Sequence, residues 1–254
     1  MMNTIELSAY LNDYLDFPAF RGDVSNNGLQ VEANPEVRKI VTGVDACMAL
    51  FEAAKRRGAD LIMVHHGMSW GGEPRRFTGD VGRRLQFLFN HRISLYAAHL
   101  PLDAHPVLGN NAILGETIGL ENRQMFCCYD GADIGVRGQL PSPMTAREIS
   151  EMYREKLGCA GTVYADSGQA LRRIGCISGG AGHSGLAAAL EAGLELLVTG
   201  AMEHELYHPA LEAGLAVLAL GHYGSETVGI KALGELTAEK FGLDVEFIDI
   251  PTDL

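Results

Sequence analysis

The feature that most restricts the fold is an order of apolar and helical segments that occurs twice along the chain. Each half contains three short apolar segments with the composition of buried strands: 39–45, 61–64 and 93–98, then 173–177, 196–199 and 215–220. Segments with helical periodicity separate them, and a helix over 228–240 and a strand over 245–250 close the chain. This alternation is typical of α/β layers whose sheets are covered on both faces.

The repeat also sets the expected domain organisation. We expect two related α/β lobes with mostly covered sheets, 1–125 and 126–254, that face a central cleft. The segment 125–161 between the halves shows short strand-like pieces and a helix that begins at the capping pair Thr145 and Glu148. A chain of 254 residues is long enough to bury a core in each lobe.

The net charge narrows the range of partners. The formal charge is −12 and the pI is near 5.1, so the surface as a whole repels phosphate backbones. This argues against broad nucleic-acid binding. A local positive site, such as one made by bound metal ions, could still attract an anionic small molecule.

Cysteine usage and the N-terminal residues indicate the compartment. The five cysteines are an odd number without CxxC spacing, which favours a reducing compartment and buried thiols over a disulfide framework. The N-terminus predicts an amphipathic helix that begins after Asn3 and ends near Leu15, and it lacks the pattern of a signal peptide. No segment reaches the length of a membrane span. We therefore expect a cytoplasmic protein.

Metal-ligating side chains follow the predicted strands at their carboxyl ends, where ligands collect in α/β sheets. An adjacent histidine pair ends one strand, and the repeat aligns a His-x-x-x-Asp unit of the first half with a His-x-x-x-Glu unit of the second. A lone histidine at a strand end is usually structural, but matched groups of this kind favour metal ligands. The candidates are His65, His66, His99, Asp103, His222 and Glu226.

This set of donors favours two divalent ions. Adjacent side chains such as His65 and His66 diverge from a strand, so they serve two ions more readily than one. A carboxylate from Asp103 or Glu226 can bridge the ions, and mixed nitrogen and oxygen donors suit zinc, manganese or iron. A bridging water would ionise near neutral pH and act as a nucleophile. For His99 the roles of ligand, orienting group and general acid/base stay open, and we leave it outside the ligand set.

Two other motifs compete with this interpretation. The segment 204–208 fits the HExxH motif of zinc peptidases, but Pro209 disturbs a helix there and no third ligand follows. The segment 180–185 fits the GxGxxG pattern of dinucleotide-binding turns, which also arises wherever a strand and a helix pack closely. Its helix N-terminus could instead hold a substrate phosphate near the metals.

A basic cluster and the single tryptophan follow the histidine pair. Arg75, Arg76, Arg83 and Arg84 could steer an anionic substrate, although most such arginines are simply solvated. Trp70 could stack on a base or pack under its own loop.

Seven stretches carry a resemblance that runs in order over almost the whole chain: 27–32, 41–44, 64–67, 99–106, 109–111, 221–226 and 247–251. Together they resemble the Nif-three-like family, whose members are also called GTP cyclohydrolase 1 type 2 homologs, in the short bacterial form without an inserted domain. The resemblance implies a dinuclear metal centre inside a toroidal homohexamer. The family's ligand motifs fall on His65, His66, Asp103, His222 and Glu226.

Two classes of function follow. The first is a metal-dependent hydrolase that acts on an anionic substrate, such as a nucleotide or a phosphoester. The family label suggests GTP ring opening, whereas a two-metal site more generally suits phosphoester or amide hydrolysis. The second is a non-catalytic metal-holding or metal-responsive hexameric scaffold that acts through partners.

Overall fold

The computed structural model describes residues 1–72, 76–252 and 254. The chain divides into two compact units, Met1–Leu102 with Gly229–Ile250 and Asp103–Val228 with Pro251–Leu254. This division differs from the expected lobes 1–125 and 126–254. The last helix and strand of the chain belong to the first unit, so that unit is made of two separate stretches of sequence.

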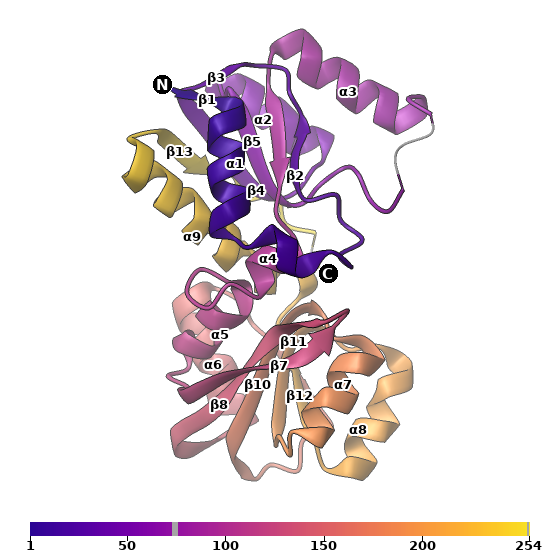
Figure 1. Cartoon of the computed structure of the whole chain (residues 1–254). Helices are drawn as coiled ribbons and strands as arrows, with labels where there is room; N and C mark the ends of the chain where they lie inside the picture. Colours follow the sequence, from indigo (N-terminus) through magenta and orange to yellow (C-terminus); the bar gives the residue numbers. More distant parts are fainter. Residues whose placement is uncertain (73–75, 253) are drawn as a thin grey trace. The chain divides into compact units, whose positions relative to one another are not determined.

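The first unit contains a five-stranded sheet with a parallel centre (Figure 1). In space the order of strands is β13–β4–β5–β6–β2. Neighbours from β13 to β6 run parallel, and β2 is antiparallel to β6 at one edge. The strands are β2 (Gly28–Val31), β4 (Lys39–Asp45), β5 (Leu61–His66), β6 (Ser94–Ala97) and β13 (Asp244–Phe247), and a separate ribbon joins β1 (Met2–Asn3) to β3 (Glu36–Val37).

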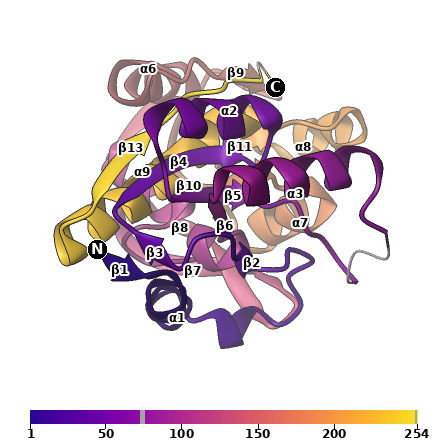
Figure 2. The same ribbon diagram turned by 90° about the horizontal axis from the view of Figure 1, so that it is seen from above.

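Two helices cover one face of this sheet. α2 (Met48–Arg57) and α3 (Gly79–His91) place Phe51 and Leu88 against the apolar side chains of β4, β5 and β6. Figure 2 shows both helices on one side of these strands. α2 ends at Gly58, whose φ of +70° is a backbone conformation that glycine adopts without strain.

Two further helices lie over the other face. α1 (Thr4–Tyr14) begins at Asn3, whose Oδ1 accepts hydrogen bonds from the first turn of the helix, as the sequence predicts. The last turn of α9 (His222–Phe241) meets α1 where the rings of Tyr10 and Phe241 pack edge-on, 5.1 Å between centroids. α9 begins six positions before the predicted 228–240. Gly224 and the β-branched Thr227 have low helix propensity and hide this first turn.

The second unit contains a six-stranded sheet in the order β7–β8–β10–β11–β12–β9. The central strands β10, β11 and β12 run parallel, and antiparallel strands flank them. The strands are β7 (Glu121–Tyr129), β8 (Ala132–Thr145), β9 (Thr162–Tyr164), β10 (Ala170–Gly180), β11 (Leu196–Ala201) and β12 (Ala216–Ala219). The expectation of short strand-like pieces in 125–161 is wrong, because β7 and β8 form a long hairpin. Its residues are mostly exposed or half-buried, so it shows no apolar run.

Helices cover both faces of the second sheet as well (Figure 1). On one face the core contains α5 (Asn110–Thr117) and α6 (Ala146–Leu157), with Tyr153 fully buried. On the other face it contains α7 (Gly182–Glu191) and α8 (Tyr207–Ala213). A complete capping box at Thr145 begins α6, as the sequence predicts.

The two units repeat one pattern of hydrogen bonds where their parallel strands begin. In the first unit the carboxylate of Asp60, just before β5, accepts the backbone N–H groups of Arg38 and Lys39 at the start of β4. In the second unit the carboxylate of Glu195, just before β11, accepts those of Arg172 and Arg173 in β10. The backbone bonds agree too. The Asp60 N–H donates to the carbonyl of Lys39, as the Glu195 N–H donates to that of Arg173. The Asp60 carbonyl accepts from the Ser94 N–H, as the Glu195 carbonyl accepts from the Ala216 N–H.

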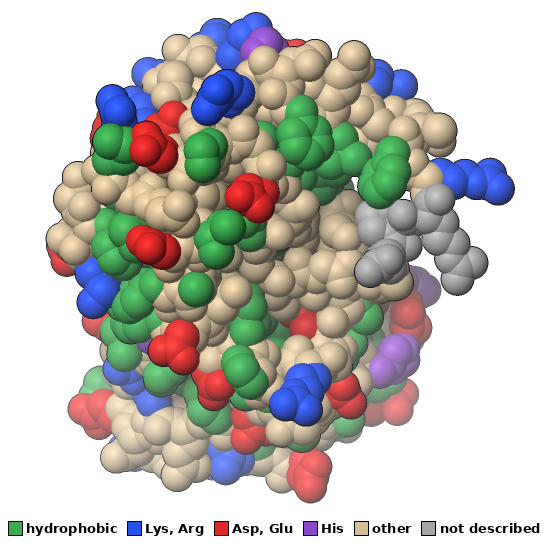
Figure 3. All heavy atoms as spheres, turned by 45° about the horizontal axis from the view of Figure 1, so that its top comes forward, with side chains coloured by type: hydrophobic (Ala, Val, Ile, Leu, Met, Phe, Trp, Pro, Cys, Tyr) green, Lys and Arg blue, Asp and Glu red, His purple; other side chains and the backbone are tan. Residues whose placement is uncertain are grey.

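The surface agrees with the acidic composition. On the face drawn in Figure 3, acidic side chains are scattered singly among apolar and basic ones. None of the helices in the described residues is long and apolar enough to cross a bilayer. No disulfide joins the five cysteines, all of which the structure describes. Cys127 and Cys176 are buried as expected, whereas Cys47 and Cys159 are half-buried and Cys128 is exposed.

Candidate metal centre

Three histidines of the first unit gather where its central strands end. His65 and His66 are the last two residues of β5, and His99 follows the end of the neighbouring strand β6. One ligand atom from each ring lies within 4.8 Å of those of the other two. The ring centroids are 4.6 Å apart for His65 and His66, and 5.1 and 5.6 Å from these to His99. The adjacent rings therefore lie close together, in contrast to the divergence expected from strand geometry.

Each of these rings has its Nδ1 atom held by an oxygen. His65 Nδ1 lies 2.9 Å from the carbonyl oxygen of Ala98, and His66 Nδ1 lies 2.8 Å from Asp45 Oδ1. His99 Nδ1 lies 2.8 Å from Oδ1 of Asp23. A carbonyl or a carboxylate can only accept, so Nδ1 carries the proton and donates. In a neutral ring the lone pair is then on Nε2, the arrangement typical of metal-ligating histidines.

Asp23 is a buried carboxylate surrounded by donors. Its side chain is fully buried, and it accepts hydrogen bonds from His99 Nδ1, the N–H groups of Ser25 and Leu100, and the side-chain amide of Asn27. Burial raises the pKa of Asp23, but the hydrogen bond and the charge of His99, with the bonds from Ser25 and Asn27, outweigh it. The pKa of Asp23 therefore lies below its ordinary value, and the group is ionised at neutral pH.

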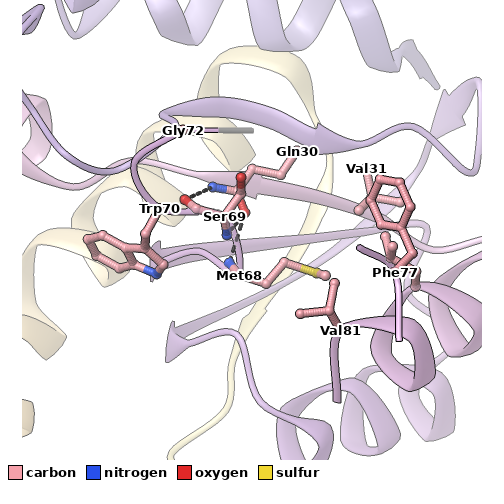
Figure 4. A pocket seen from close by; sticks show the side chains of 9 residues that line it. Gln30, Val31, Met68, Ser69, Trp70, Gly72, Phe77 and Val81 are labelled. Atoms are coloured by element: carbon pink, nitrogen blue, oxygen red, sulfur yellow. Dashed lines mark hydrogen bonds between the residues drawn. The ribbon is translucent and has the colours of Figure 1, made fainter. Parts of the chain in front are cut away.

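The loop after β5 separates these histidines from an apolar pocket. The Trp70 indole packs edge-on against His99, with ring centroids 5.1 Å apart, and donates a hydrogen bond to the carbonyl oxygen of Gly67. In Figure 4 the indole points away from the pocket, while Met68 points toward Val81. The pocket has a volume of about 330 Å³ and is lined by Gln30, Val31, Met68, Ser69, Trp70, Gly72, Phe77, Val81 and Leu85.

The second unit contributes a histidine and a carboxylate from the first turns of α9. His222 and Glu226 are one helical turn apart, and His222 Nε2 lies 3.4 Å from Glu226 Oε1. Glu226 is buried, with 3% of its surface exposed, whereas the His222 side chain is 43% exposed. Both residues thus lie on a helix rather than in the loop that the sequence suggested.

Asp103 is the other carboxylate of the second unit. It ends the short helix α4 (Leu100–Asp103) and is 6% exposed. Its Oδ1 accepts hydrogen bonds from the Asn110 side chain and the Ser178 hydroxyl, both at 2.8 Å. These two donors fix the direction of the Asp103 carboxylate. The residue after Ser178, Gly179, lies against the pair on α9.

Gly179 leaves the space that the acidic side chain of α9 occupies. A Cβ atom added at this position would lie 2.3 Å from Glu226 Oε1 and 3.1 Å from His222 Nε2. The φ angle of +61° also favours glycine, and the Gly179 N–H donates to the hydroxyl of Ser225. The end of β10 is thus shaped around His222 and Glu226.

The backbone hydrogen bonds align the two halves one residue away from the alignment that the sequence suggested, in which His99 corresponds to His222. The Ala98 N–H donates to the carbonyl of Val64, and the Leu220 N–H donates to that of Thr199. His99 therefore corresponds to Gly221 rather than to His222. Sequence reasoning also missed the roles of Asp23, Asp45, Asn110 and Ser178. The contacts of Asp23, Asp45 and Ser178 join residues far apart in the chain. Local signals exist for two of the four, because Asp23 lies just before the stretch 27–32 and Asn110 lies within the stretch 109–111, seven residues after Asp103.

The competing motifs lack a complete site in the described residues. His204 lies in a 3₁₀ turn and His208 in α8, and neither joins a group of three metal-ligating side chains there. In the glycine-rich turn, Gly185 packs against Ala181 and Ile177, which explains a glycine there without a ligand.

The basic cluster is partly outside the described residues, because Arg75 is not among them. Arg76 and Arg83 are exposed, and Arg83 pairs with Asp80 on the same helix. These two side chains are therefore consistent with the simple interpretation of solvated arginines.

The donor atoms of the candidate ligands suit a divalent metal ion. The first unit offers three imidazoles with oriented rings, and the second offers an imidazole, the oriented carboxylate of Asp103 and the buried carboxylate of Glu226. Imidazole with carboxylate is the donor combination of zinc, manganese and iron sites.

Comparison with known proteins gives matches over the full length. The description of the Duf34/NIF3 family (NGG1p interacting factor 3) matches residues 2–253. A protein of Archaeoglobus fulgidus named GTP cyclohydrolase 1 type 2 homolog is 45% identical over 253 residues, covering 100% of both chains. One of Haemophilus influenzae with the same name is 41% identical over 251 residues, covering 98% of both.

Solved structures agree with the sequence matches. A structure titled as protein ybgI, of unknown function, has a TM-score of 0.91 and 38% identity to this chain. A protein from Thermus thermophilus has a TM-score of 0.89 and 37% identity. Both alignments cover 100% of both chains, so the similarity includes every strand and helix that carries a candidate ligand.

Proposed function

Because the chain belongs to the Duf34/NIF3 family, we propose that it is a metal-dependent hydrolase. Its two divalent ions would be held by His65, His66, Asp103, His222 and Glu226. The observation that carries the proposal is the orientation of the rings in the first unit. An oxygen accepts from Nδ1 of each ring, and the three rings present their ligand atoms within 4.8 Å of one another.

The chain's own groups prepare the donors before any ion binds. Asp45 and the Ala98 carbonyl fix the rings of His66 and His65. The rings therefore lose less rotational freedom when a metal ion binds. Asn110 and Ser178 fix the Asp103 carboxylate in the same way. Divalent ions held there would supply Lewis acidity and would lower the pKa of a bound water toward neutrality.

The charge of such a site favours an anionic substrate. Four positive charges from two divalent ions exceed the two negative charges of Asp103 and Glu226, within a protein of net charge −12. A nucleotide or a phosphoester would be attracted to this local excess. The curated relatives named GTP cyclohydrolase 1 type 2 homolog support a nucleotide as the first substrate to test.

Metal analysis tests the site. The wild type should retain two ions per chain after dialysis, and the double variant His65→Ala/Glu226→Ala should retain almost none. His183→Ala is the matched control, because His183 is a 75% exposed side chain on α7 and should leave the metal content unchanged. Two ions per chain in the double variant would sink the assignment.

A turnover assay tests the reaction class. Protein loaded with zinc, manganese or iron should hydrolyse a member of a panel of nucleotides and phosphodiesters, and should leave short peptides intact. Tight metal retention without turnover on any member would replace the hydrolase with a metal-holding scaffold.

We also propose, from the cysteine usage and the N-terminal residues, that the protein is cytoplasmic and, from the family resemblance, that six copies assemble into a toroid. Light scattering should then give a mass near six times 27.3 kDa.

A further inference from the structure

We propose that Asp23 is a positioning residue of the metal centre, which fixes the ring of His99 so that its Nε2 atom faces the ligand atoms of His65 and His66. The inference rests on the proposed metal site. It adds a third imidazole to the ligands expected in the first unit, and it assigns that imidazole its support.

The carboxylate of Asp23 has a single possible orientation. Oδ1 accepts from His99 Nδ1 at 2.8 Å and from the Ser25 N–H at 2.9 Å. Oδ2 accepts from Asn27 Nδ2 at 2.7 Å and from the Leu100 N–H at 3.1 Å. Each oxygen thus has two donors, and the side chain is fully buried. Rotation of this carboxylate would break several hydrogen bonds of a side chain that is buried from solvent.

The same segment also holds the backbone of His99. Asn27 donates to Asp23 through its amide nitrogen, and its amide oxygen accepts from the His99 N–H at 2.7 Å. The residues 23–27 therefore fix both the backbone position and the ring of His99. Because an imidazole directs its lone pair through only two torsion angles, this support determines where Nε2 points.

The support of His99 matches that of a predicted ligand. Asp45 accepts from His66 at the same Nδ1 distance of 2.8 Å, yet the Asp45 side chain is 38% exposed, whereas that of Asp23 is fully buried. His66 and His99 are also equally exposed, each with 18% of the side chain accessible. A histidine with only a packing role would not need a ligand atom within 4.8 Å of those of two other imidazoles.

Cobalt binding provides the test. Cobalt(II) is titrated into the wild type, Asp23→Asn, His99→Ala and the double variant, in competition with a chromophoric chelator. The visible absorption of bound cobalt, which responds to the number and kind of its ligands, is recorded alongside. Asp23→Asn should weaken cobalt binding by roughly 10- to 100-fold and shift the spectrum toward that of His99→Ala.

A double-mutant cycle separates positioning from a structural role. If Asp23 acts through His99, Asp23→Asn should lower cobalt affinity only when His99 is present. The matched control is Asp60→Asn, because Asp60 also accepts from two backbone N–H groups and from Asn34 but, among the hydrogen bonds of the described residues, from no histidine. It should lower thermal stability and leave cobalt affinity unchanged.

Each other outcome overturns the proposal in a recognisable way. Equal losses of affinity from Asp23→Asn with and without His99 would assign Asp23 to the loop rather than to the ring. An unchanged affinity and spectrum in Asp23→Asn, with normal binding by the wild type, would reject the positioning role alone. A wild type that binds no cobalt, zinc, manganese or iron would reject the metal site as well.

Discussion

The two units are alike where their parallel strands begin and different where those strands end. At the beginning, Asp60 and Glu195 occupy corresponding positions and accept the same pair of backbone N–H groups from the neighbouring strand. At the end, the first unit presents imidazoles anchored through Nδ1. The second unit presents His222 with Glu226, and the Asp103 carboxylate that the Asn110 amide and the Ser178 hydroxyl orient. The two units thus share the arrangement of their parallel strands but carry different side chains at the ends of those strands.

The corresponding residues at the strand ends show how far the units differ. The positions of His65 and His99 in the first unit correspond to Gly200 and Gly221 in the second, by the backbone bonds that precede them. A Cβ atom at Gly200 would lie 2.7 Å from the Cα of His222. The second unit therefore has no room for an imidazole at a position where the first unit carries one.

Alanine substitutions at corresponding positions of the two cores should have the largest effect on stability. Ile62 and Leu197 occupy corresponding positions in β5 and β11 and are 0% and 2% exposed. Replacing either by alanine should lower the free energy of unfolding by about 2–5 kcal/mol, through lost burial and the cavity left behind. Urea unfolding followed by circular dichroism measures both. If one substitution lowers the free energy of unfolding by less than about 1 kcal/mol and the other by more, the two positions are not equivalent.

A substitution at the end of β10 should affect the second unit alone. Gly179→Ala should lower stability by roughly 1–3 kcal/mol, because φ is +61° and the new Cβ displaces the Glu226 carboxylate. Metal content should fall as well. Gly182→Ala is the control, since Gly182 has a φ of +57° but no atom within 4 Å of a Cβ, so it should lose stability and keep the metal. Equal metal content in both variants would contradict the role of Gly179.

The carboxylates at the beginning of the strands should have a smaller effect and none on metal. Asp60→Asn and Glu195→Gln should each lower stability by about 1–2 kcal/mol, because the hydrogen bonds lose their charged acceptor. Chemical unfolding and metal analysis on the same samples check both statements. Loss of metal from either variant would show that changes at the beginning of the strands affect the candidate ligands at their ends.

Glu195 also gives the stability of the second unit a pH dependence. Burial raises the pKa of Glu195, but the N–H groups of Arg173 and Arg172 and the charge of Arg173 outweigh it, so the folded pKa lies below the ordinary 4.5. Its stabilisation is therefore full above pH 4.5 and is lost as the pH falls through the folded pKa. Urea midpoints measured across this range should decline less steeply in Glu195→Gln than in the wild type.

Loss of a helix cap should have the smallest effect, and a similar one in each unit. Asn3→Ala removes the cap of α1, and Thr145→Ala removes the capping box of α6. Each should lower stability by about 1 kcal/mol, measured by thermal unfolding. A much larger loss at Thr145 would indicate that the β8–α6 junction has a further role.

The sequence predicts the parallel strands well because their signal is local. The segment 39–45 coincides with β4, and the pair His65 and His66 lies at the end of β5. The hairpin of β7 and β8 escaped prediction because its exposed side chains carry no apolar pattern. The first turn of α9 escaped because Gly224, which comes close to Cys159, weakens the helical signal.

The candidate ligands were predictable, but their supports were not. His65, Asp103 and Glu226 follow apolar strand segments, which can be located from the sequence alone. Asp23 reaches His99 only through the tertiary fold, and Ser178 reaches Asp103 in the same way. Hydrogen bonds between residues so distant in sequence leave no trace in local composition.

The pairing of β13 with β4 has a consequence for synthesis of the protein. Residues 244–247 pair in parallel with residues 39–42, so one edge of the first sheet is closed by a strand that is translated after every other described strand of both sheets. Until then the nascent chain presents β4, an apolar strand, with an open edge that invites pairing with other chains. Premature stop codons shortly before residue 244 should therefore yield aggregates, even though every candidate metal ligand has already been translated.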